Sequence, residues 1–219
     1  MAIKENIQEI LSSIPKSVTL VAVSKTKPEK DLLEAYDAGQ LVFGENKIQE
    51  MTQKWENLPK DIQWHMIGHV QTNKVKYMAE YVSLIHGVDS LKLLKEINKQ
   101  AKKNNRIIAC LLQMHIAEED TKFGLDETEL QEVLSSETFQ KLHNVQVVGL
   151  MGMASFTDDK NQIRREFKHL KILFDKLNDT MPEIHTLSMG MSGDYQIAIE
   201  EGSTMIRIGS SIFGERNYN

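Results

Sequence analysis

Short apolar runs rich in valine and isoleucine alternate along the chain with longer amphipathic stretches. Eight of these runs are predicted to be buried strands: 18–25, 41–45, 62–68, 82–88, 107–116, 145–154, 184–191 and 204–209. Helical spacing of apolar residues predicts helices between them: 29–38, 47–55, 72–80, 91–103, 126–134, 161–178 and 194–200. Ile3, Ile7 and Ile10 share one face of an earlier segment, which predicts an extra helix at the N-terminus.

Two of the predicted helices carry end signals as well as apolar spacing. Ser90 directly precedes the helix 91–103, and its hydroxyl can accept a hydrogen bond from the first turn. Gly39 follows the helix 29–38, where glycine commonly ends a helix in a left-handed conformation.

Strands that are apolar on both faces and alternate with helices are typical of a parallel sheet covered by helices. Eight such units predict an α/β fold, a closed (β/α)8 TIM barrel; an open doubly wound sheet is the alternative. The chain has 219 residues, close to the lower end of about 200 for this barrel. With no linker or low-complexity tract in the sequence, we expect one domain over residues 1–219.

Composition narrows the class of protein further. The chain is 41% hydrophobic and 26% charged, which is typical of a globular protein, and its net charge of −5 argues against nucleic acid as a partner. No segment approaches the length of an apolar membrane span or signal peptide, so we expect no membrane partner and a cytoplasmic protein. Cys110 is the only cysteine; it lies in an apolar run and is predicted to be buried rather than catalytic.

The last two predicted strands end in turns rich in serine and glycine. Ser188 and Ser192 belong to SMGMSGD, and Arg207, Gly209 and Ser210 belong to RIGSSIFGER. Glycines let backbone N–H groups approach an anion, and hydroxyls add donors. Because the loops after strands 7 and 8 of a barrel commonly bind phosphate, the two turns together predict a phosphate site.

Lys25 ends the first predicted strand, at the same end of the barrel, and could reach the far end of a phosphorylated ligand. Simpler interpretations remain: Lys25 could be a solvated strand-end lysine, and Arg207 a structural ion-pair partner. His65 and His69 bracket a strand end but lack a third ligand, so no metal site is predicted. Four methionines near the strand ends are predicted to fill the core: Met151, Met153, Met189 and Met191.

Six motifs in the same order resemble one known family: SKTKP, FGENKIQE, WHMIGHVQTNK, GLMGMAS, LSMGMSGD and RIGSSIFGER. Together they resemble the single-domain pyridoxal phosphate homeostasis proteins, whose fold is similar to the N-terminal barrel domain of alanine racemase. The resemblance extends over nearly the whole chain. It implies a pyridoxal 5'-phosphate (PLP) cofactor in Schiff-base linkage to Lys25 and a role in vitamin B6 homeostasis.

The resemblance also assigns roles to other positions. It implies that the phosphate is contacted by Ser192, Gly209 and Ser210, with Ser188 in the same loop. It places Arg207 near the pyridine nitrogen, and it implies that the cofactor face is lined by Asn46, His65 and Met66. His69 and His115 depart from the family pattern, in which proline and asparagine are expected.

An amine attacks an aldehyde only when it is unprotonated, and a free lysine is almost wholly charged at neutral pH. We therefore expect partial burial and the nearby Arg207 to lower the pKa of Lys25.

Carrier and enzyme remain alternatives. Racemisation needs an acid or base on each face of the substrate, and in the racemase one is a tyrosine from a second domain, for which we expect no counterpart here. Arg207 would also keep the pyridine nitrogen unprotonated and weaken the ring as an electron sink. We therefore expect a monomeric PLP carrier without turnover, with apo-PLP enzymes as possible recipients. The alternatives are a racemase-type PLP enzyme completed by an oligomer partner, and a phosphate-binding barrel enzyme without PLP.

Overall fold

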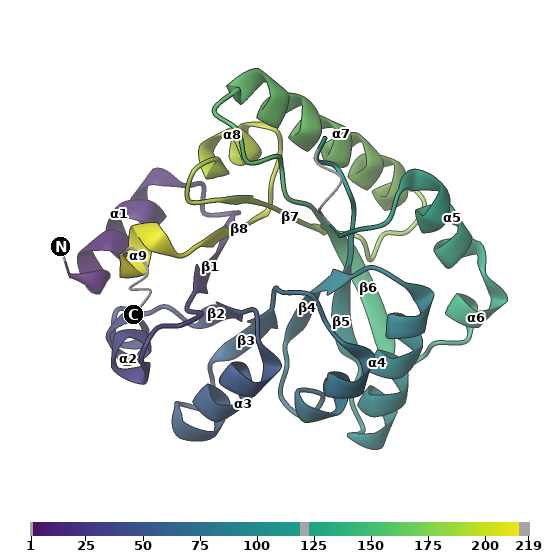
Figure 1. Ribbon diagram of the computed structural model, residues 1–219, viewed down its shortest axis with the longest axis horizontal. Coiled ribbons are helices and arrows are strands. Elements are labelled where there is room, and N and C mark those ends of the chain that lie inside the picture. Colours follow the sequence, from purple (N-terminus) through teal and green to yellow (C-terminus); the bar gives the residue numbers. More distant parts are fainter. Residues whose placement is uncertain (1, 119–122, 215–219) are drawn as a thin grey trace.

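Eight parallel strands form a closed barrel in which each strand pairs with the next and β8 pairs with β1 (Figure 1). The computed structural model describes residues 2–118 and 123–214. The strands are β1 (Thr19–Val23), β2 (Val42–Glu45), β3 (Gln63–Met66), β4 (Leu84–Val88), β5 (Ile108–Gln113), β6 (Val145–Met151), β7 (Thr186–Met191) and β8 (Met205–Ile208). The predicted (β/α)8 barrel is confirmed, and the open sheet is excluded.

Helices surround this ring of strands (Figure 1). They are α1 (Ile3–Ser13), α2 (Glu29–Asp37), α3 (Ile48–Asn57), the 3-10 helix η1 (Thr72–Tyr77), α4 (Leu91–Lys103), α5 (Glu127–Ser135), α6 (Glu137–Gln140), α7 (Lys160–Asn178), α8 (Tyr195–Glu200) and α9 (Ser210–Phe213). The predicted N-terminal helix is present as α1. The short helices α6 and α9 were not predicted, because four residues are too few to show a helical repeat.

Two predictions about the elements need correction. Every observed strand is shorter than its predicted range, because apolar residues continue past the strand ends; Met114 and Ile116, for example, are buried beyond β5. The predicted helix 72–80 is wrong in type, since residues 72–77 form a 3-10 helix. Val75 in this helix and Met78 just after it are both buried and three residues apart, which suits a helix with three residues per turn.

The core has two parts. A large cluster joins strand residues to the helices, and a smaller one is drawn from strand residues such as Val21, Leu84 and Leu111. Because successive strand residues point to opposite faces, we assign the smaller cluster to the barrel interior. Cys110 is buried, as predicted.

The predicted helix end signals are confirmed. The Ser90 hydroxyl accepts a hydrogen bond from Leu93 N at 3.2 Å at the start of α4, and Gly39 has φ +95° just after α2. Both features mark the points at which the chain enters or leaves a helix.

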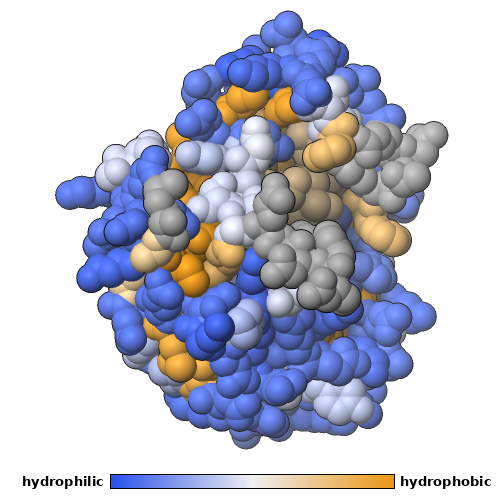
Figure 2. All heavy atoms as spheres, turned by 60° about the vertical axis from the view of Figure 1, so that its left-hand side comes forward, coloured by the Kyte–Doolittle hydropathy of each residue, from blue (hydrophilic) through white to orange (hydrophobic). Residues whose placement is uncertain are grey.

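Helix α1 packs beside α2 and α9 (Figure 1), and Asn6 Nδ2 donates to Ile212 O at 2.8 Å across the α1–α9 contact. Figure 2 shows this side of the molecule, where hydrophilic residues cover most of the surface and hydrophobic ones form small separate groups. Within the described ranges, no helix is both long enough and apolar enough to cross a membrane.

Candidate functional site

A pocket of about 550 Å³ lies at the carboxyl ends of the strands, within the size range of small-molecule sites. Six of the nine site residues suggested by the sequence line it: Lys25, Asn46, Ser192, Arg207, Gly209 and Ser210. They follow or end strands β1, β2, β7 and β8, so the barrel brings together residues that are far apart in the sequence.

The other three residues lie behind this wall. Ser188 and His65 are buried and belong to a hydrogen-bonded chain beneath Arg207. Met66 is 1% exposed and belongs to the large core between strands and helices. Because it follows His65 directly in β3, its side chain points to the opposite face of the strand.

Arg207 is a buried cation whose guanidinium reaches the pocket from β8. It donates to Ser188 Oγ at 2.5 Å and to Gly152 O at 3.1 Å, and both of these acceptors are neutral. Burial lowers the pKa of Arg207 to about 10, and the Asp194 carboxylate acts in the opposite direction. Arg207 therefore stays charged at neutral pH and places a positive charge at the pocket wall.

Two buried histidines continue the hydrogen bonds from Ser188. His86 Nδ1 lies 2.9 Å from Ser188 Oγ, and His86 Nε2 lies 3.0 Å from His65 Nδ1. Arg207 can only donate, so Ser188 accepts from it and gives its own hydrogen to His86. His86 then carries its proton on Nε2 and donates to His65, so every bond runs in one direction away from the guanidinium.

Burial keeps both imidazoles neutral. It lowers the pKa of His65 from 6.5 to about 3. Burial, together with His65 and the charge of Arg207, also lowers the pKa of His86 well below 6.5. The hydrogen-bonded series of Ser188, His86 and His65 is therefore neutral, and it stabilises the charge of Arg207 without adding a second buried cation.

We predict a measurable acid dependence from His65. Unfolded histidine takes up a proton below pH 6.5 while folded His65 does not until about pH 3, so stability is lost as the pH falls through this window. Between pH 7 and pH 5 this single group should lower the free energy of unfolding by about 2 kcal/mol. Urea unfolding of wild type and His65→Asn at both pH values measures the difference; the amide oxygen introduced by this substitution can still accept from His86. Equal losses in the two proteins would contradict the prediction.

The two serine and glycine turns meet at the pocket. Gly209 N donates to Ser192 Oγ at 3.3 Å, and Met191 N donates to Asp194 Oδ1 at 2.6 Å. Among the described residues, the pocket wall carries Lys25, Lys27 and Arg207 against one acidic residue, Asp194. A cationic pocket in a chain of net charge −5 favours an anionic ligand.

Glycines let the ends of β2, β3 and β4 approach one another, on the side of the pocket away from the turns after β7 and β8. A Cβ on Gly68 would lie 2.6 Å from Asn46 O, and a Cβ on Gly87 would lie 2.6 Å from Gly68 O. The ends of β2, β3 and β4 thus pack backbone against backbone, which only glycine allows.

The mouth of the pocket is aromatic and apolar. His69 stacks on Phe123, with ring centroids 4.7 Å apart, and His69 Nδ1 lies 3.5 Å from Asp89 Oδ2. Met153 and Met191 also line the pocket. Met153 still packs against the smaller core cluster, whereas Met191 is exposed, so the prediction that Met191 fills the core is wrong. They stand at or beyond the strand ends, whereas Met151 and Met189 are buried as predicted.

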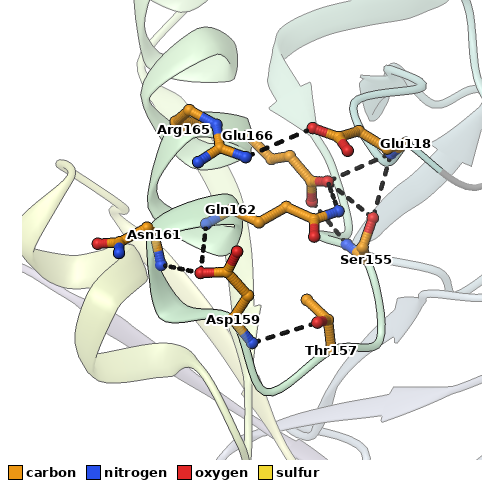
Figure 3. Close-up of polar contacts among 8 residues, drawn as sticks. All are labelled: Glu118, Ser155, Thr157, Asp159, Asn161, Gln162, Arg165 and Glu166. Carbon is orange, nitrogen blue, oxygen red and sulfur yellow. Dashed lines mark hydrogen bonds and ion pairs between the residues drawn. The ribbon is translucent and has the colours of Figure 1, made fainter.

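One carboxylate fastens the loop on the β6 side of the mouth (Figure 3). Glu166 of α7 accepts from Ser155 N at 2.6 Å, Ser155 Oγ at 2.7 Å, Gln162 Nε2 at 3.1 Å and Glu118 N at 3.2 Å. Burial acts to raise the pKa of Glu166, but these hydrogen bonds outweigh it and lower the pKa. Phe156, next to Ser155, is 98% exposed at the pocket rim.

Sequence reasoning missed other residues of this region, among them His86, Gln113 and Phe123. His86 and Gln113 were polar residues within apolar strand runs, and that contrast could have singled them out. Phe123 lies in a loop and carried no such signal; the Gln113 amide donates to its carbonyl at 3.0 Å. Across the described residues, no group of three or more His, Cys, Asp or Glu side chains could hold a metal ion.

Comparison with known proteins adds independent information. The family model described as alanine racemase, N-terminal domain, matches residues 1–217. A pyridoxal phosphate homeostasis protein of Vibrio alginolyticus is 40% identical over 100% of this chain and 99% of its own length. Another of that name, from Aquifex aeolicus, is 42% identical over 91% of this chain and 87% of its own.

Solved structures agree with this fold. PipY of Synechococcus elongatus, solved with PLP bound, has a TM-score of 0.88 and 34% identity, covering 97% of this chain and 100% of that one. An alanine racemase of Clostridium difficile has a TM-score of 0.79 at 14% identity, covering 100% of this chain and 57% of that one. The second likeness concerns the fold alone.

Proposed function

Because the chain belongs to the family of pyridoxal phosphate homeostasis proteins, which share the fold of the alanine racemase N-terminal domain, we propose that it binds PLP and serves vitamin B6 homeostasis. One observation of the structure carries the proposal. Lys25 lines the same pocket as the buried cation Arg207 and the serine and glycine turns after β7 and β8. The PLP bound to PipY supports the same ligand.

The residues present fit this cofactor. Ser192, Gly209 and Ser210 would hold the phosphate with hydroxyl and backbone donors, and Arg207 would face the ring nitrogen. When bound, PLP supplies an aldehyde that can form a Schiff base. Lys25 would supply the amine: its Nζ would join the aldehyde carbon, the carbonyl oxygen would leave as water with two amine hydrogens, and the third proton of the initial ammonium would go to solvent.

We propose a carrier rather than an enzyme. The relatives matched along nearly their full length carry the name of homeostasis proteins. Arg207 stays charged at neutral pH, so it would not leave a proton on the ring nitrogen, and the ring would be a weaker electron sink. We further propose that the protein acts as a cytoplasmic monomer and releases PLP to apo-enzymes.

A spectroscopic titration tests the function. Purified protein mixed with PLP should gain an absorption band near the visible edge, and borohydride should fix an adduct that mass mapping places on Lys25. A protein that stays colourless with PLP would point to a phosphate-binding barrel of another kind. Steady turnover of added amino acids would instead identify a racemase-type enzyme.

The anion site yields a prediction of its own. Arg207→Ala and Ser210→Ala should each weaken PLP affinity at least about tenfold, because a hydrogen bond to a charged group contributes roughly 1.5–3 kcal/mol. Equilibrium dialysis measures the affinities. Ser211→Ala is the matched control, since Ser211 is the neighbour of Ser210 but is not part of the pocket wall. Unchanged affinity in both variants would show that the phosphate lies elsewhere.

A further inference from the structure

The residues on both sides of Lys25 are held by side chains that do not themselves reach the pocket. Ser24 Oγ donates to Glu45 Oε1 at 2.6 Å, and Ser24 O accepts from Lys54 Nζ at 2.8 Å. On the other side, Thr26 N donates to Glu50 Oε1 at 2.6 Å. Hydrogen bonds therefore hold the backbone in place both before and after Lys25.

Thr26 stands in a conformation that needs such support. Its φ is +65°, in the left-handed region that β-branched residues rarely adopt. Such a residue persists only where its surroundings hold it. The hydrogen bond from its N–H to Glu50 provides that hold one residue after Lys25.

Lys54 joins the contacts into one group. Its buried Nζ donates to Ser24 O, to Glu45 Oε1 at 2.8 Å and to Glu50 Oε1 at 2.7 Å. An ammonium has three hydrogens, and these three acceptors use all of them. Since Glu45 ends β2 and the other two residues belong to α3, the group ties the end of β1 to both elements.

Stability alone does not account for this arrangement. A buried ion pair contributes little stability compared with apolar residues of the same volume, because both charges lose their water. Glu45 Oε2, moreover, is buried without a hydrogen-bond partner. Burying the charged side chains of this group costs free energy, and they contact the two residues beside Lys25. We therefore look for their role in the position of Lys25.

We infer that Glu45, Glu50 and Lys54 are positioning residues that fix where the Lys25 amine stands in the pocket. The inference rests on the proposed function, in which that amine forms a Schiff base with PLP and releases water. Release of the Thr26 flank should leave the phosphate and ring contacts intact while misplacing the amine. Ligands without an aldehyde should then be unaffected.

The test compares Glu50→Ala with Glu50→Gln, PLP with pyridoxamine 5'-phosphate, and each variant with wild type. Glu50→Ala should slow Schiff-base formation roughly tenfold to hundredfold, since small misplacements cost this much. Its affinity for pyridoxamine phosphate, which has the ring and phosphate but no aldehyde, should match wild type. Glu50→Gln keeps an acceptor for Thr26 N and should return the rate to within about threefold of wild type.

Hydrogen exchange of the Thr26 amide gives a readout that needs no ligand. It should be at least about tenfold faster in Glu50→Ala than in wild type or Glu50→Gln. Glu137→Ala is the matched control, because Glu137 forms a similar but exposed pair with Lys141 one helical turn on, at 3.5 Å. This control should behave as wild type in every measurement.

Three outcomes overturn the inference. One is an unchanged Schiff-base rate in Glu50→Ala, and another is an equal loss of affinity for PLP and pyridoxamine phosphate, which would report general damage to the pocket. The third is wild-type protein that forms no Schiff base; then the proposed function fails first, and the inference falls with it.

Discussion

Lys25→Ala should abolish the absorption band that the wild-type protein gains with PLP, together with the borohydride-fixed adduct. The reason is chemical: without the amine no C=N bond can form, even if the other pocket residues still bind PLP. The phosphate contacts of the turns after β7 and β8 should persist, so the variant should still bind pyridoxamine phosphate. Absorption spectra, mass mapping and equilibrium dialysis measure these three properties.

Lys47→Ala is the control for this change. Lys47 also follows a strand end, one residue after Asn46, but it is exposed and is not part of the pocket wall. It should keep both the band and the adduct. A Lys25→Ala protein that still formed a fixed adduct would move the attachment to another lysine and contradict the assignment.

Lys54→Met should lower the free energy of unfolding by about 3–5 kcal/mol at pH 7, because removing one partner of a buried pair leaves the other charge uncompensated. Glu45, which is buried, would lose its cation, and Ser24 O would lose a donor. Urea unfolding measures the change. Lys141→Met, which removes an exposed helix pair, should cost no more than about 0.5 kcal/mol.

The cost of Lys54→Met should depend on pH in a definite direction. Burial raises the pKa of Glu45, and Lys54 opposes that rise. Without Lys54 the pKa of Glu45 in the folded protein rises further above its value in the unfolded chain. The folded protein then takes up a proton at a higher pH than the unfolded chain, so stability is greater at low pH and is lost as the pH rises through the folded-state pKa. The deficit should therefore shrink between pH 7 and pH 5. A deficit that stayed constant would mean that Glu45 is not the group left unpaired.

The barrel could be predicted from the sequence because its signal is repeated eight times. Apolar runs give the strands, and the amphipathic stretches between them give most of the helices. The predictions failed where the signal was short or ambiguous. Val75 and Met78 fit both an α-helical and a 3-10 spacing, and the four residues of α9 show no period at all.

The candidate site was predictable only at its wall. Strand-end residues such as Lys25 and Asn46 stand out because polar or small residues follow apolar runs. The layer behind the wall does not stand out, because it depends on which strands face each other across a closed ring. His86 contacts Ser188 although β4 and β7 are three strands apart in the ring. The order of residues along the chain does not show that such distant strands come together.

The Glu166 carboxylate has a consequence for how ligand preference can change within this fold. It binds backbone N–H groups from the loops after β5 and after β6, although α7 contributes no residue to the pocket wall as far as the structure describes it. The loop that carries Phe156 at the rim of the pocket is thus held by a helix of the outer layer. We therefore expect substitutions of Glu166 to shift this loop while every residue of the described pocket wall stays the same.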